Sequence, residues 1–166
     1  MTCQAATTLP RKAALLAHRS EHGVAPATRA RAAWLSGISL AGLGRLLGPH
    51  PAWERRAAEA ARHWLRLVDE GRNAASWRTA SPLLREGAEP TEWETAMRSV
   101  RAPLGRCLSR RLRSHVAVDG PCEELQGPYV VVRYDSVFEH LGRRIETVTP
   151  VLGTDGCWRV AAYFVG

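Results

Sequence analysis

The chain has 166 residues, of which 45% are apolar and 23% are charged, and this composition is ordinary for a globular protein with a buried core. It excludes a wholly disordered chain, a collagen and a coiled coil. No run of about 18 uncharged apolar residues occurs, so a protein with several membrane-spanning helices is excluded as well.

The net charge of +7 is concentrated near the N-terminus. Residues 1–53 contain six basic residues and one acidic residue, whereas residues 54–166 contain 17 basic and 15 acidic residues. A nucleic-acid-binding domain usually carries its excess positive charge on one folded face. Because most of the excess here lies in the first 53 residues, we expect no nucleic-acid partner for the remainder.

Residues 1–53 are predicted to form a leader, either a secretory signal or a disordered extension, and residues 54–166 a single domain. The stretch 32–44 is uncharged and follows Arg29 and Arg31, as the apolar region of a secretory signal does. It is too short to span a bilayer, so no transmembrane segment is expected. A signal would make the protein periplasmic or envelope-associated, and otherwise it would be cytoplasmic.

Apolar residues at helical spacing predict about three helices before residue 105. The first covers 54–70 and precedes Gly71, which is typical of a left-handed helix end. A shorter helix covers 73–80, and the third opens near Thr91, which matches a capping box with Glu94. The third helix has one apolar stripe, formed by Trp93, Met97, Val100 and Leu104.

Beyond Gly105 apolar residues recur at every second position, which predicts four strands: 108–118, 129–140, 145–152 and one that begins at 158. Their short connections make neighbouring strands antiparallel. In the first strand the predicted core-facing residues are Leu108, Leu112, Val116 and Val118, and the solvent-facing residues are Arg111, Arg113 and His115. In the later strands the predicted core-facing residues are Val130, Val132, Tyr134, Phe138, Trp158, Val160, Ala162 and Phe164.

Helices followed by strands predict an α+β domain, in which the N-terminal helices pack on one face of a four-stranded antiparallel sheet. The same order of elements occurs in cystatin-like and NTF2-like cones, which is an analogy of fold only.

Several short motifs follow one another through the predicted domain. They include Trp64-Leu65-x-Leu67-Val68-Asp69-x-Gly71, Val100-Arg101-x-Pro103-Leu104-Gly105, Glu146-Thr147-Val148-Thr149-Pro150 and Asp155-Gly156-x-Trp158-Arg159-Val160. Over about residues 57–165 the chain resembles the bacterial family called domain of unknown function 4019. Members are typically small exported or envelope-associated proteins, so the resemblance implies an envelope location. The family has no assigned reaction, and no catalytic residue is carried over.

No motif of nucleophilic, phosphate-binding or metal chemistry is present. The four cysteines form no C-x-x-C pair, so we expect no zinc site and no cofactor. Cys122 and Cys157 are expected to be free thiols, with a disulfide as the alternative in an exported protein. The polar strand residues that could act as acid or base are His115, Tyr134, Asp135 and His140, although alternation places Tyr134 and Asp135 on opposite faces.

Six arginines form the densest basic cluster: Arg98, Arg101, Arg106, Arg110, Arg111 and Arg113. They could hold an anion. The alternative is a solvated sheet face on which Glu139 and Glu146 balance the arginines.

We therefore expect a non-enzymatic domain that binds a protein partner or a small apolar ligand, with a homodimer as a further alternative. The second hypothesis is a small cone-fold enzyme, of isomerase or hydrolase type, that uses a pocket His or Asp. A ligand would lie between the helices and the sheet, although ordinary core packing explains the same aromatic residues. The predicted ligand-binding residues are Tyr134, Trp64, Trp93, Phe138 and Trp158.

Overall fold

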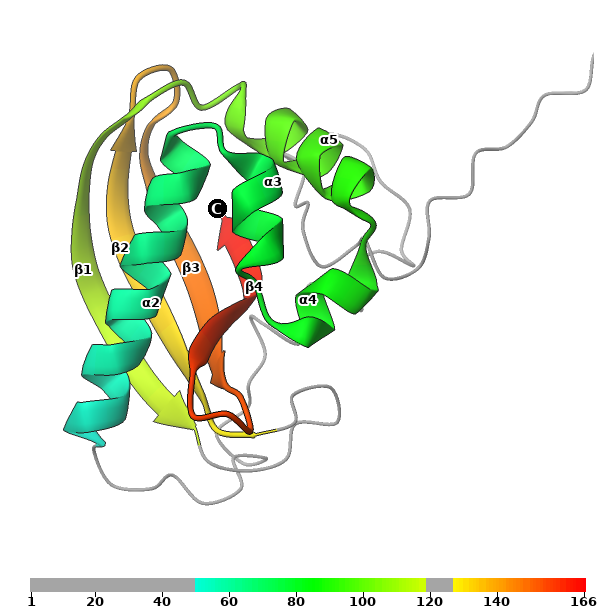
Figure 1. The fold of residues 1–166 in the computed structure, drawn as a ribbon. Helices are drawn as coiled ribbons and strands as arrows, with labels where there is room; N and C mark the ends of the chain where they lie inside the picture. The colour runs from blue at the N-terminus through cyan, green and yellow to red at the C-terminus, as the bar shows by residue number, and fades with distance from the viewer. Residues whose placement is uncertain (1–49, 119–126) are drawn as a thin grey trace, which may run out of the picture.

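The computed structural model describes residues 50–118 and 127–166 (Figure 1). Most of the predicted leader and Cys122 lie outside these residues. The described helices are α2 (Pro51–Asp69), α3 (Asn73–Arg78), α4 (Pro82–Gly87) and α5 (Pro90–Arg101), and the strands are β1 (Cys107–Val118), β2 (Tyr129–Phe138), β3 (Gly142–Leu152) and β4 (Trp158–Val165).

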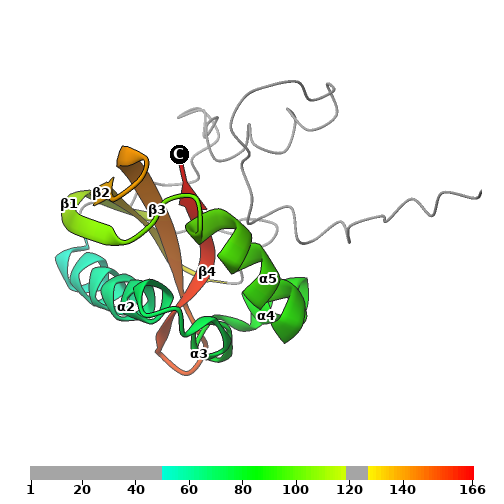
Figure 2. The same ribbon diagram turned by 90° about the horizontal axis from the view of Figure 1, so that it is seen from above.

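The four strands form one sheet in the order β1-β2-β3-β4, with every neighbouring pair antiparallel. Helix α2 lies across one face of this sheet and contacts all four strands, while α3, α4 and α5 lie beside β4 (Figure 2). The α+β class and the four-stranded antiparallel sheet are thus confirmed. No helix among the described residues is long and apolar enough to cross a membrane.

Proline occupies the first turn of both longer helices. Helix α2 begins at Pro51, three residues before the predicted start at Glu54, and Pro51 occupies the first turn, where a missing N–H is tolerated. In α5, Pro90 takes the same place. The predicted capping box of Thr91 and Glu94 is therefore wrong, and the Glu92 carboxylate accepts the backbone N–H of Glu89 at 3.1 Å.

Helix α4 was not predicted, because its apolar residues are too few to show a helical period. Ser81 begins it, since the Ser81 hydroxyl accepts the backbone N–H of Leu84 at 3.3 Å. Pro82 follows in the first turn, where it starts the helix rather than breaking it.

Strand β1 contradicts part of the predicted division of its residues between core and solvent, although Val118 is buried and Arg111 and Arg113 are exposed as predicted. Leu108, Leu112 and Val116 are exposed to 59%, 44% and 46%, although all three were predicted to face the core. The pairing with β2 shifts twice along β1, and each shift interrupts the two-residue alternation. His115, predicted to face solvent, pairs with Val132, which is buried under α2.

The last part of β4 also faces the other way from the prediction. The register between β3 and β4 shifts next to Pro150, which has no N–H for the sheet ladder. After this shift Tyr163 faces the helices, and Ala162 and Phe164 lie on the opposite face. The predicted core positions Trp158 and Val160 are correct.

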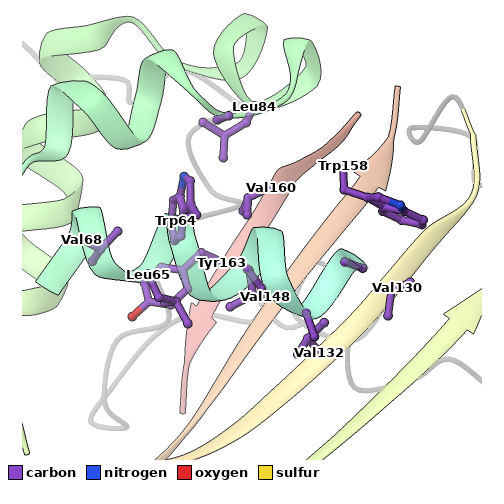
Figure 3. Close-up of a cluster of buried hydrophobic side chains, with 14 of the residues drawn as sticks. Trp64, Leu65, Val68, Leu84, Val130, Val132, Val148, Trp158, Val160 and Tyr163 are labelled. Atoms are coloured by element: carbon purple, nitrogen blue, oxygen red, sulfur yellow. The ribbon is translucent and has the colours of Figure 1, made fainter. Parts of the chain in front are cut away.

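The main core lies between α2, the three shorter helices and the sheet. Trp64 of α2 packs edge-on against Trp93 and Tyr163, with ring centroids 6.0 and 5.3 Å apart. Figure 3 shows Trp64 and Tyr163 with the sheet residues Val130, Val132, Val148 and Val160, which are at most 1% exposed. This packing fixes α2 and β4 against each other.

We expect Trp93→Ala to lower the free energy of unfolding by about 3–5 kcal/mol, because Trp93 is fully buried and its indole N–H bonds the Ser76 hydroxyl at 3.0 Å. Denaturant unfolding of the full chain measures this. Leu108→Ala is the control, with an expected change below about 0.5 kcal/mol at an exposed site. A loss at Trp93 no greater than that of the control would contradict the described core.

Candidate functional site

All five predicted ligand-binding residues are buried between the helices and the sheet. Their exposed fractions are 0% for Trp93, 1% for Phe138, 2% for Trp64, 3% for Tyr134 and 9% for Trp158. The structure brings Trp64, Trp93, Tyr134 and Trp158 into the main core cluster. Phe138 lies apart from this cluster, under the guanidinium group of Arg101, whose central carbon is 4.8 Å from the ring centroid.

Most polar atoms of these residues bond to the protein itself. The Tyr134 hydroxyl donates to the backbone oxygen of Ala58 at 3.4 Å, and the Trp64 indole N–H donates to the Ser76 backbone oxygen at 2.9 Å. Of these five residues, only Trp158 has a buried polar atom, its indole N–H, without a hydrogen-bond partner among the described residues. The Tyr134 hydroxyl thus bonds a buried backbone group. Ligand contact at these residues stays a prediction.

A network of charged side chains lies at the other end of the buried sheet face, and sequence analysis did not predict it. Its centre is Glu146 of β3, whose side chain is fully buried. Around it, α2, α5 and the other three strands each contribute one polar residue: Asp69, Arg101, Arg110, Ser136 and Tyr163.

Both carboxylate oxygens of Glu146 accept several hydrogen bonds. Oε1 accepts from Arg101 Nη1 at 3.1 Å, from Arg110 Nη2 at 3.1 Å and from the Tyr163 hydroxyl at 2.7 Å. Oε2 accepts from Arg110 Nε at 2.6 Å and from the Ser136 hydroxyl. A buried carboxylate needs such donors to offset its lost hydration.

Asp69, the last residue of α2, binds the same two arginines. One of its oxygens accepts from Arg101 Nη2 at 2.6 Å, and the other accepts from Arg110 Nη1 at 2.6 Å. Two arginines therefore bridge two carboxylates, and the formal charges cancel. The network ties the C-terminal ends of α2 and α5 to β1 and β3.

The network raises the pKa of its arginine and tyrosine members. Burial by itself lowers the pKa of Arg110, but its hydrogen bonds to Asp69 and Glu146 outweigh burial and raise that pKa. Burial, followed by the negative charge of Glu146, raises the pKa of Tyr163 well above its ordinary value. Tyr163 therefore remains a hydroxyl donor to Glu146.

The predicted position of Glu146 on a solvated face is wrong. The pattern contained a sign of its burial, because Glu146 has the same two-residue phase as Val148, which is also fully buried. Ser136 likewise shares its phase with Val132 and Tyr134 of β2. These residues were missed because polar side chains are usually assigned to solvent.

The predicted arginine cluster is divided among separate partners. Arg101 and Arg110 belong to the buried network, whereas Arg98, Arg106 and Arg113 form exposed ion pairs: Arg98 with Glu94 at 3.7 Å, Arg106 with Glu139 at 3.1 Å and Arg113 with Asp135 at 3.1 Å. One common anion site made of all six arginines is therefore not present among the described residues.

Of the residues suggested for an enzyme, His115 and Asp135 are not brought together. The Nδ1 atom of His115 lies 3.3 Å from a carboxylate oxygen of Glu54 in α2, whereas Asp135 pairs with Arg113 on the opposite face of the sheet. Burial raises the pKa of the Cys107 thiol, which disfavours the nucleophilic thiolate. In the described ranges, no group of three or more metal-ligating side chains occurs.

The surface around β1 is the other unusual feature. Strand β1 lies at one end of the sheet, and none of the described strands pairs with its outer edge (Figure 1). Its exposed apolar residues, Leu108, Leu112 and Val116, follow this edge. We use "β1 edge" for these three residues and the strand backbone between them.

The family model described as "Protein of unknown function (DUF4019)" matches residues 60–163, which is more than half of the chain. The chain belongs to this family. No curated protein and no solved structure matches it significantly. The match covers α2 from its middle onward and nearly all of the sheet, so Asp69, Arg101, Arg110, Ser136 and Glu146 all lie within it.

We expect Glu146→Gln to lower the free energy of unfolding by about 3–5 kcal/mol, because two buried arginines then share the single carboxylate of Asp69. Glu139→Gln is the matched control, since within residues 50–118 and 127–166 its exposed carboxylate pairs only with Arg106, and we expect an unchanged melting temperature. Equal effects of the two substitutions, in denaturant and thermal unfolding, would show that the network does not stabilise the fold.

Alkaline pH tests the burial of Tyr134, because burial raises its pKa from 10.0 to about 12. In the unfolded chain the hydroxyl ionises first, so its stabilising contribution is complete below pH 10 and is lost as pH rises towards 12. We expect the free energy of unfolding of Tyr134→Phe to fall less over this pH interval than that of the natural protein. Parallel pH curves for the variant and the natural protein would contradict the burial.

Proposed function

We propose that the domain is a non-enzymatic interaction module that binds a protein partner along the β1 edge. The observation that carries this proposal is the exposure of Leu108, Leu112 and Val116 on a strand whose outer edge pairs with no described strand. An open strand edge offers backbone donors and acceptors to another chain, and exposed apolar side chains add contact area.

The β1 edge is held firmly enough to serve as a binding surface. Arg110, in the middle of the exposed stretch, turns inward and bonds both Glu146 and Asp69. At the other end of the strand, Ala117 and Val118 are 6% and 7% exposed. A binding surface on such a fixed strand loses little conformational entropy when a partner binds.

The two other hypotheses have less support. A small apolar ligand would have to separate Trp64, Trp93 and Tyr134, which are buried and already bonded to the protein. A cone-fold enzyme would need a pocket His or Asp, whereas the His115 ring lies 3.3 Å from Glu54 and Asp135 pairs with Arg113 at 3.1 Å. A protein partner needs only the surface that is exposed.

We also propose that the protein is associated with the bacterial envelope and that its sheet and helices form a cystatin- or NTF2-like cone. The uncharged stretch 32–44 and the family resemblance support the location. The order of helices before strands supports the cone.

Site-specific crosslinking tests the interaction module. We expect a photoreactive residue at Leu112 of the full chain to form an adduct with one protein in the native cell, and the same residue at exposed Arg85 of α4 to form none. The partner, once purified, should bind the natural chain about 5- to 30-fold more tightly than Leu112→Ser, as expected for an apolar contact of about 1–2 kcal/mol. Adducts of equal yield at both positions, or an unchanged affinity of Leu112→Ser, would refute the proposal.

A further inference from the structure

We infer that the segment bound by the β1 edge is an extended acidic strand of a partner protein, in which carboxylate side chains alternate with apolar ones. This inference rests on the proposed function and specifies the chemistry of the partner. It follows from the side chains that β1 presents on its two sides and from the charges near them.

The face of the sheet that points away from the helices is strongly cationic near β1. Arg111 and Arg113 lie on β1, Arg133 on β2 and Arg143 on β3, and the register places Arg111 directly across from Asp135. Asp135 already pairs with Arg113 at 3.1 Å. Among the described residues, no carboxylate lies within ion-pair distance of Arg111, Arg133 or Arg143, so this face has positive charge left for a partner.

A hollow near this face is lined by Arg143 but not by Arg111 or Arg133. It has a volume of about 390 Å³ and is lined by Arg113, Asp135, Arg143, Arg144, Ile145 and Gly166. Three guanidinium groups face one carboxylate there, and guanidinium binds carboxylates through paired hydrogen bonds. Because Arg113 belongs to β1, the hollow begins at the strand that would receive the partner.

The opposite side of β1 presents Leu112 at the same height, between the inward-facing Arg110 and His115. Leu112 pairs with Tyr134, whose ring faces α2, whereas Arg111 pairs with outward-facing Asp135. A strand added beside β1 points its successive side chains to alternate faces. Its side chains on the outer face would meet Arg111 and Arg113, and those on the helix side would meet Leu112. The complementary sequence therefore alternates carboxylate and apolar residues.

Charge disfavours the two other occupants of the edge. A second copy pairing through its own β1 would set arginine against arginine, and like charges on paired strands are destabilising. Residues 1–49 of the same chain contain six basic residues and one acidic residue, so they too are repelled. The arginines and the two register shifts of β1 thus discourage unselective edge pairing, and an acidic strand remains the complementary partner.

The test uses the full chain and a labelled peptide of about ten residues in which Glu and Val alternate, with binding followed by fluorescence anisotropy. We expect binding that weakens as salt rises, and no binding of the matched Lys/Val peptide. An N-methylated Glu/Val peptide, which cannot pair its backbone with a strand, should not bind either. Equal binding of the Lys/Val or N-methylated peptide would overturn the inference.

Variants locate the binding. Arg111→Gln and Arg133→Gln should each weaken Glu/Val binding by about two- to fivefold, Leu112→Ser should weaken it as well, and Arg85→Gln on α4 should leave it unchanged. Effects of the arginine variants without an effect of Leu112→Ser would mean an anion on the outer face and no strand at the edge, which overturns the inference.

Two further measurements on the same protein detect the other possible occupants of the β1 edge. A dimer in sedimentation that Leu112→Ser dissociates would assign the edge to a second copy, and an adduct from Leu112 to residues 1–49 in the purified chain would assign it to the chain itself. Either result overturns the inference. If the acidic peptide does not bind, but binding of the partner crosslinked in cells still requires Leu112, only the inferred chemistry of the partner is wrong. If neither the peptide nor a cellular partner binds, the proposed function is wrong too.

Discussion

The buried carboxylate of Glu146 is the constraint on which the rest of the structure depends. A fully buried charge is tolerated only when opposite charges and hydrogen-bond donors surround it, and here Arg101, Arg110, Ser136 and Tyr163 do so. These residues come from one helix and three different strands. Their side chains meet only when the sheet has its observed register and α5 ends beside it, so the charge penalises other arrangements of the same elements.

The aromatic core and the charged network contribute to the fold in different ways. Trp64, Trp93 and the sheet valines supply apolar burial, which is the larger stabilising contribution but specifies geometry loosely. The network adds less net free energy, because desolvation offsets most of its attraction. We regard its role as one of specificity: Asp69 at the end of α2 and Arg110 on β1 hold their elements at one relative position.

Strand β1 separates an inner surface that serves the fold from an outer surface left for binding. Arg110 turns inward to a neutral network, whereas Arg111 and Arg113, its near neighbours, lie on the outer face where basic residues exceed acidic ones. Ordinary alternation along the strand makes this division, because no register shift separates Arg110 from Arg111. The same strand can therefore be locked in place and still offer apolar and cationic side chains to a partner.

The sequence by itself determined the α+β class, the antiparallel strand order, the face of β2 that is buried and the family, because these depend on local periodicity and short connections. Only the tertiary structure decided which residues of β1 and β4 face the core, since register shifts such as that beside Pro150 arise from pairing between strands. The burial of Glu146 was likewise decided there. Its burial is favourable only once Arg101 and Arg110, 45 and 36 residues away in the chain, are in contact with it.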